Sequence, residues 1–293
     1  MKYKIYCDAS GDVDPRLISS TGAGIISMQY IIDGVKYTST GIDSDAEMIS
    51  FYNKLKDGRL PTTEAISIYQ FEEVFTPIMA DGSSILYLAL SSGLSPTYET
   101  ALHAARVFKA KYPNQEFIPI DSLSATGGIG VLLEKMLYNQ RIGMDIYQNK
   151  TDIEEYKKHI RTTAYVTDLS HLKRGGRISQ ASAAFGSMFN IKPLIKMDET
   201  GHLVVYEKKR GTKAAIDSLA AEYQLYADYS SVVYVSDANN EYLIDDLVEK
   251  IKELNPKAVI KRKKLTTIIG SHIGPEGIAI SYKLKEWLHI YKK

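Results

Sequence analysis

The chain has 293 residues, 44% of them hydrophobic, which is enough to build the cores of two ordinary domains and argues against disorder. Its 36 lysines and arginines nearly balance 35 aspartates and glutamates, so the net charge of +1 gives no electrostatic basis for a nucleic-acid partner. The single cysteine, Cys7, excludes an intramolecular disulfide and a cysteine zinc cluster, which fits a cytoplasmic protein. No stretch reaches the roughly 18 uninterrupted apolar residues of a spanning helix, so we expect no stable insertion into a membrane.

The first half of the chain predicts buried parallel strands joined by helices. Three short apolar runs each end in a cluster of small polar residues: Tyr3–Cys7, Ile85–Leu90 and Phe117–Ile120. Continuous apolar runs of this length are typical of strands buried on both faces. Apolar residues at helical spacing then follow Ser95–Thr97, with Pro96 at the first helical position, and again follow Gly130. This alternation predicts an α/β fold.

The second half predicts a second α/β domain with a mixed sheet, because its strands have fewer helical crossovers between them. The expected helices are Thr212–Tyr226 and Ile244–Leu254, and the expected strands are Ala164–Thr167, Asn190–Ile195, Leu203–Tyr206, Ser231–Ser236, Leu265–Gly270 and Ile278–Tyr282. We expect the boundary within the charged stretch Asp152–Arg161. This gives an N-terminal domain of residues 1–160, a C-terminal domain of residues 161–293 and a ligand cleft between them.

Four loops carry the residues that could bind an anion. Ser91–Thr97 and Asp121–Gly130 lead from strands into helices, where free N–H groups favour negative charge, although their hydroxyls could simply cap those helices. In Leu172–Ser179, the donor fork of Arg177 suits a carboxylate or phosphate, with a solvated basic turn as the alternative. In the glycine-rich segment Gly270–Gly277, which we expect to form a turn, His272 could donate to a carboxylate, act as an acid or base, or be purely structural.

Several signatures of enzymes are missing from the sequence. It contains no phosphate-binding GxxxxGK[ST] loop, no GxGxxG, no GxSxG nucleophile elbow and no HExxH, and the histidines other than His272 show no metal-ligand spacing. The residues alone therefore predict an α/β protein with a hydroxyl-rich, anion-binding cleft between two domains, without a metal or a cofactor.

Seven segments, in chain order, resemble the motifs of the DegV family: Asp8–Asp14, Pro61–Ser67, Ser91–Thr100, Asp121–Gly130, Leu172–Ser179, Asn190–Leu194 and Ser271–Gly277. The resemblance covers essentially the whole chain. It implies two α/β domains, the N-terminal one with a three-layer, mostly parallel sheet and the C-terminal one with a two-layer mixed sheet.

The resemblance also implies a function without catalysis. The protein would bind a long-chain fatty acid in a buried tunnel and present its carboxylate to a kinase subunit that uses ATP, so that the acyl phosphate formed there feeds phospholipid synthesis. The resemblance assigns carboxylate contacts to Thr63 and Ser92, with Arg177 and His272 as further partners, and places kinase docking at Arg210. A monomer is expected.

Several departures from the family pattern lie near the expected site, among them Pro96 and Glu276, each in place of a glycine, and Glu64. Glu64 follows Thr63 where the family has serine, and we expect its side chain to point to solvent, because a carboxylate pointing inward would repel the ligand.

Two other functions fit the same sequence. The cleft could carry another apolar carboxylic acid, such as an isoprenoid or branched acid. A hydrolase or transferase using Ser92 and His272, oriented by Asp121, would need the serine oxygen within hydrogen-bond reach of the imidazole.

Overall fold

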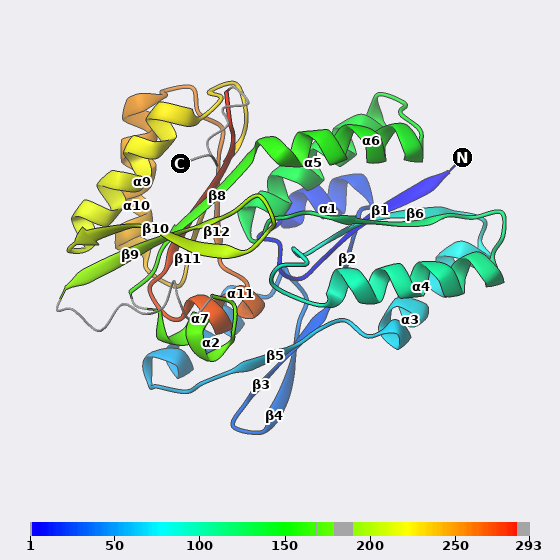
Figure 1. Cartoon of the computed structure of the whole chain (residues 1–293), viewed down its shortest axis with the longest axis horizontal. Helices are drawn as coiled ribbons and strands as arrows, with labels where there is room; N and C mark the ends of the chain where they lie inside the picture. Colours follow the sequence, from blue (N-terminus) through cyan, green and yellow to red (C-terminus); the bar gives the residue numbers. More distant parts are fainter. Residues whose placement is uncertain (1, 168, 179–189, 286–293) are drawn as a thin grey trace.

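The computed structural model describes residues 2–167, 169–178 and 190–285, and these form two α/β domains and a small projecting sheet (Figure 1). The N-terminal domain is built on a parallel sheet with the strand order β2-β1-β6-β7. Its strands are β1 (Tyr3–Asp8), β2 (Gly24–Ile26), β6 (Ser84–Ala89) and β7 (Phe117–Asp121). Every residue of β6 is buried, as the continuous apolar run predicted.

Helices cover both faces of this parallel sheet, so the predicted three-layer arrangement is confirmed (Figure 1). They are α1 (Pro15–Thr21), α3 (Ile68–Ala80), α4 (Thr97–Lys111), α5 (Gly127–Arg141) and α6 (Ile146–Tyr156), followed by a 3-10 turn, η1 (Lys157–His159). Helix α2 (Asp45–Lys56) instead packs against the short helix Thr267–Ile273. Helix α4 begins at Thr97, one residue later than predicted, and Pro96 is its cap. Capping boxes such as Ser67 with Gln70 on α3 fix where several of these helices start.

A three-stranded antiparallel sheet projects from the N-terminal domain, at the bottom of Figure 1. Its order is β4-β3-β5, with β3 (Met28–Ile32) in the middle, β4 (Val35–Ser39) and β5 (Thr62–Glu64). Strand β5 carries Thr63, so this small sheet places one of the predicted ligand contacts.

The C-terminal domain has a six-stranded sheet with the order β10-β9-β8-β13-β11-β12. The strands are β8 (Ile160–Tyr165), β9 (Ile191–Met197), β10 (Leu203–Arg210), β11 (Val233–Asp237), β12 (Ile260–Lys264) and β13 (Ile278–Lys283). Only the pair β11 and β12 is parallel among the described pairs of this sheet, so the predicted mixed sheet is confirmed. Helices α9 (Thr212–Tyr226) and α10 (Glu241–Leu254) cover its outer face (Figure 1).

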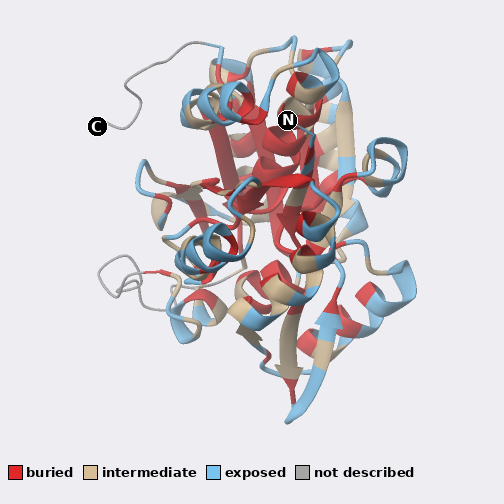
Figure 2. Ribbon diagram, turned by 90° about the vertical axis from the view of Figure 1, so that its right-hand side faces the viewer, coloured by how far each residue is buried: buried red, intermediate tan, exposed pale blue. Residues whose placement is uncertain are grey.

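Helix α5 lies between the two large sheets and contacts strands of both. It buries ten residues. Two of its buried glycines, Gly127 and Gly130, leave room for the side chain of Tyr234 on β11 to approach closely. One apolar core therefore runs from Ile5 of the first sheet to Ala164 of the second. Figure 2 shows the buried residues gathered along the sheets, with exposed residues on the outer helices. The first strand of the second sheet begins at Ile160, while the exact boundary between the domains stays a prediction.

One predicted strand is wrong. Leu265–Gly270 was expected to be extended, but residues Thr267–Ile273 form a short helix, α11, and the strand before it is β12. The run of β-branched and apolar residues is compatible with any buried element, and tertiary contacts decide between them. Here the N–H of Thr266 donates to the buried carboxylate of Asp12, 3.1 Å away, which fixes the helix start. Consequently His272 lies on a helix rather than in a turn.

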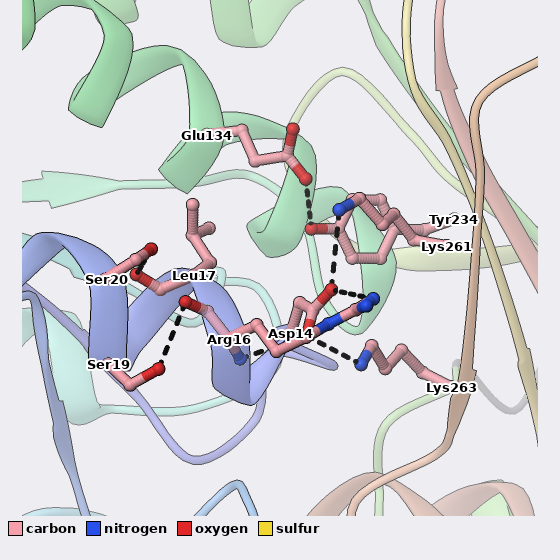
Figure 3. A network of polar contacts seen from close by, with 9 residues as sticks. All are labelled: Asp14, Arg16, Leu17, Ser19, Ser20, Glu134, Tyr234, Lys261 and Lys263. Atoms are coloured by element: carbon pink, nitrogen blue, oxygen red, sulfur yellow. Dashed lines mark hydrogen bonds and ion pairs between the residues drawn. The ribbon is translucent and has the colours of Figure 1, made fainter.

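Charged side chains also join the domains. Asp14, just before α1, is 2% exposed and forms ion pairs with Lys261 at 3.4 Å and Lys263 at 3.3 Å, both on β12 (Figure 3). Nearby, the hydroxyl of Tyr234 donates to Glu134 of α5 at 2.6 Å. These contacts hold the second sheet against the N-terminal domain.

Candidate functional site

Two of the predicted ligand contacts lie side by side, although 209 residues separate them in the chain. The hydroxyl oxygen of Thr63 on β5 is 2.9 Å from Nε2 of His272 on α11. Nδ1 of the same ring is buried and has no hydrogen-bond partner in the described part of the chain. The contact brings the small projecting sheet and α11 together at the rim of one cavity.

The imidazole of His272 is held in its neutral form. Burial, together with the positive charges of Arg177, Arg174 and His171, lowers the pKa of His272 to about 3. A neutral ring carries one N–H, so it can donate one hydrogen bond and accept another. This suits a group that hydrogen-bonds a carboxylate without itself becoming charged.

Arg177 lies just after α7 (Ser170–Arg174) and connects the two domains. Its Nε donates to the carbonyl of Leu94 at 2.9 Å, and Nη1 donates to the carbonyl of Gly175. Burial lowers the pKa of the guanidinium, although an arginine still remains a cation. Arg177 therefore sets the position of the Ser91–Thr97 loop and supplies positive charge at the cavity.

The structure does not bring Ser92 to this cavity. Its side chain is exposed, and its N–H donates to Asp121 at 3.1 Å. The amide groups of Leu94 and Ser95 both donate to the carbonyl of Ser91, so the loop forms a tight turn here. Ser92 is not among the residues that line the cavity, whereas Ser95 is.

Ser95 is the serine of this loop that lines the cavity, and the sequence analysis missed it. It is 7% exposed, and its hydroxyl lies 2.9 Å from that of Thr97. The sequence held no signal that separates it from Ser92, because the tight turn at Ser91 decides which hydroxyl faces the cavity. Ser91, one turn earlier, is occupied by a hydrogen bond to the carbonyl of Gly201 at 2.7 Å.

Arg210 lies outside this group of residues. It is the last residue of β10, it is exposed, and it is not among the residues that line the cavity. Ser179, the last residue of the Leu172–Ser179 motif, lies outside the described residues.

The cavity itself is apolar and lies between the domains. The apolar walls come from the inner face of the second sheet, from α11 and from the loop after β6, and include Met28, Leu90, Leu94, Ile195, Met197 and Ile268. Its polar lining residues are Thr63, Glu64, Ser95, Thr126, Thr162, Thr163, Arg177 and His272. Four of them are linked, because Thr63 contacts His272, the charge of Arg177 acts on His272, and Arg177 binds the carbonyl of Leu94 next to Ser95: Thr63, Ser95, Arg177 and His272. We call these four residues the head-group site.

Glu64 lies on the rim, and its charge is paired. Its carboxylate is 2.7 Å from the ammonium group of Lys36, which reaches over from β4. Both side chains are partly exposed, so the expectation that Glu64 points to solvent agrees with this ion pair. The positive partner reduces the repulsion that an anion at the mouth would meet.

The geometry does not support a serine–histidine–aspartate arrangement. Nε2 of His272 contacts Thr63, whereas the Ser92 side chain is exposed outside the cavity. Asp121 accepts hydrogen bonds from the N–H groups of Ser92 and Leu123. Within residues 2–167, 169–178 and 190–285, no group of three histidine, cysteine, aspartate or glutamate side chains forms a metal site. In the same ranges, no helix combines the length and apolar character needed to cross a membrane.

Comparisons with known proteins agree with this architecture. The model of the DegV family, described as a family of uncharacterised proteins, matches residues 2–285. A DegV domain-containing protein of Clostridium perfringens is 30% identical over 283 residues, which cover 96% of this chain and 97% of that relative. Among solved structures, DegV of Bacillus subtilis, described as a fatty acid binding protein, has a TM-score of 0.84 and 25% identity, covering 97% of this chain and 100% of that one. The Streptococcus pneumoniae Fatty Acid Kinase (Fak) B3 protein, loaded with linoleic acid, has a TM-score of 0.83 and 19% identity, with coverages of 97% and 100%.

Proposed function

This chain belongs to the DegV family, and from that premise we propose that it binds one long-chain fatty acid in the cavity between its domains and presents the carboxylate to a kinase. The observation that carries the proposal is a mostly apolar cavity whose lining includes an arginine, a neutral histidine and the hydroxyls of Thr63 and Ser95 in the head-group site. An amphiphile with one anionic end matches this distribution.

The energetics favour such a ligand. Each buried methylene contributes about 0.8 kcal/mol, so a long acyl chain supplies most of the affinity. A carboxylate taken out of water without partners would be strongly unfavourable. The hydroxyls of Thr63 and Ser95, the neutral ring of His272 and the charge of Arg177 are the groups available to it.

Two relatives support the fatty-acid assignment by analogy, since one is described as binding fatty acids and the other as loaded with linoleic acid. The second is also described as a fatty acid kinase protein. The present sequence has no ATP-binding loop of the GxxxxGK[ST] type, so the phosphoryl transfer would need a separate kinase subunit. Arg210, exposed at the end of β10, is our candidate for docking that subunit.

Native mass spectrometry of freshly purified protein tests this proposal, followed by extraction and identification of the ligand. We expect one fatty acid per chain, bound as tightly by Ser92→Ala as by the wild type and about tenfold more weakly by Ser95→Ala, the effect of one lost hydrogen bond. The two substitutions are matched, because both remove a hydroxyl from the same loop. A protein that is empty and takes up neither palmitate nor oleate would sink the proposal. If the extracted ligand is an isoprenoid acid or another apolar acid, that compound and not a fatty acid is the ligand of the cavity.

For the kinase step, Arg210→Glu should leave ligand binding unchanged and reduce acyl-phosphate formation with a purified fatty acid kinase. Lys213→Glu is the control, since Lys213 is an exposed lysine at the start of α9. Equal activity of both variants and the wild type would remove Arg210 from the interface.

A further inference from the structure

Met197 borders two separate hollows of the molecule. It is one of the apolar residues that line the cavity described above. It also lines a second pocket, which we call the far pocket, together with Leu123, Lys157, Lys158, Ile160 and Glu199. None of the four head-group residues borders the far pocket.

The position of Met197 on the sheet places it between the apolar cavity and the far pocket. It is the last residue of β9 and pairs with Leu203 of β10. Ile195, two residues earlier, points to the same face and pairs with Ala164 of β8, but it lines only the apolar cavity. Met197 therefore lies roughly 7 Å beyond Ile195 along the strand, away from the end of β8 that leads toward α7.

The side chain of Met197 can separate the two hollows and still change its conformation. Met197 is 4% exposed, so it fills the space between the two hollows. An unbranched thioether with several rotatable bonds fits irregular gaps better than a branched side chain. On its other side, Ile160 and Leu123 offer apolar surface, whereas Lys157, Lys158 and Glu199 make the outer part of the far pocket polar.

We propose that Met197 is the end wall of the acyl-chain site and sets the longest chain that the protein accepts. This inference rests on the proposed function, since it assumes that an acyl chain occupies the apolar cavity. A chain that reaches Met197 must stop there or push the thioether into the far pocket. Chains that are longer still would place methylenes among charged groups, which is unfavourable.

The consequence is a break in the dependence of affinity on chain length. Each added methylene should strengthen binding about fourfold while it enters apolar space. Beyond the length at which the terminal methyl group touches Met197, affinity should stop rising and fall. In Met197→Ala the wall is removed and the far pocket joins the cavity, so the rise should continue for at least two further carbons.

A titration of saturated acids from 12 to about 24 carbons, with delipidated wild type, Met197→Ala, Met197→Trp and Ile195→Ala, tests this directly. Ile195→Ala is the matched control, because it truncates a buried apolar side chain of the same strand without opening the far pocket. We expect the break to move to longer chains in Met197→Ala, to shorter chains in Met197→Trp, and to stay in place in Ile195→Ala.

The possible outcomes distinguish a wrong role for Met197 from the absence of fatty-acid binding. A wild type that binds fatty acids, with the same break in Met197→Ala and Met197→Trp, overturns the role of Met197 alone. An identical shift in Ile195→Ala and Met197→Ala also overturns it, because general loosening of the cavity would then be the cause. A folded wild type that binds no acid of any length overturns the role of Met197 together with the proposed function.

Discussion

The hydroxyl of Thr63 and Nε2 of His272 are 2.9 Å apart, and this contact joins two parts of the fold that have no sequence proximity. Thr63 is on the projecting three-stranded sheet, and His272 is on the helix that follows the edge strand of the C-terminal sheet. A carboxylate bound beside both groups would therefore depend on how the two domains are placed relative to each other.

The first prediction concerns Thr63. Thr63→Val keeps the shape of the side chain and removes its hydroxyl, so binding of a fatty acid should weaken about tenfold, the usual effect of one net hydrogen bond of 1 to 1.5 kcal/mol. Thr62→Val is the control, because Thr62 is exposed on the same strand. Titration calorimetry with palmitate measures both. Equal affinities in the two variants would remove Thr63 from the site.

The second prediction follows from the lowered pKa of His272. Burial first, and then Arg177, lowers this pKa from 6.5 to about 3 in the folded protein. Between these values the unfolded chain binds a proton that the folded protein does not, so the free energy of unfolding should fall as the pH drops below about 6.5. The contribution lost between pH 8 and pH 5 is on the order of 2 kcal/mol.

Urea unfolding of ligand-free protein at several pH values checks this. His272→Gln should lose that part of the pH dependence, while His103→Gln, at an exposed histidine of α4, should keep it. Other groups titrate in the same range: burial raises the pKa of Asp12 to about 6, which works in the opposite direction. The quantity to compare is therefore the difference in the free energy of unfolding between each variant and the wild type at each pH. If this difference does not change with pH for His272→Gln, the lowered pKa of His272 is not the cause of the pH dependence.

The sequence predicted the parts of the fold that depend on local pattern. The apolar runs of β1, β6 and β7, and the 3.6-residue period of α9, are found where the sequence placed them. The strand Ile260–Lys264 escaped detection because its residues are mostly basic. Those lysines are accommodated only because Asp14, remote in sequence, pairs with two of them. Such pairing has no local signal.

Contacts between residues remote in sequence also determine the start of β8 and the choice of site residues, so local pattern does not predict either. Arg161 is 3% exposed because Glu222 of α9 accepts from it at 2.7 Å, so a charged residue concealed the beginning of a buried strand. In the site, the family resemblance identified Thr63, and the basic and glycine-rich segments identified Arg177 and His272; all three line one cavity. The resemblance could not distinguish Ser92 from Ser95, because the tight turn at Ser91 decides which hydroxyl faces inward.

The third prediction concerns the ion pairs of Asp14 shown in Figure 3. Burial opposes ionisation of this carboxyl, but hydrogen bonds from Arg16 and the charge of Lys263 outweigh it and lower the pKa of Asp14 below its usual value. Lys263→Met should destabilise the protein by about 1 to 2 kcal/mol, because it removes one cation from a carboxylate that is 2% exposed. Arg16→Met should change little, since that arginine is 86% exposed.

Urea unfolding near pH 7 distinguishes the two variants. The stabilisation by a carboxyl with a lowered pKa is present above the unfolded pKa of about 4 and is lost as the pH falls below it. The difference between wild type and Lys263→Met should therefore shrink at pH 3. A larger loss in Arg16→Met than in Lys263→Met would show that the exposed arginine, and not the contact between domains, stabilises Asp14.

The fourth prediction concerns the close approach of the Ser91–Thr97 loop to the turn after β9. A Cβ atom on Gly93 would collide with the backbone carbonyl of Gly201 and approach the amide nitrogen of His202. Backbone atoms on both sides leave little room to adjust, so Gly93→Ala should push the loop outward, weaken the bond from Ser91 to Gly201 and cost about 1 to 3 kcal/mol of stability. Because Leu94 of this loop also holds Arg177, the variant should bind fatty acid more weakly than Ser92→Ala, a neighbouring exposed substitution. Thermal unfolding and palmitate titration on both proteins give the comparison, and a Gly93→Ala protein that matches Ser92→Ala in both would mean that the loop can move without disturbing the head-group site.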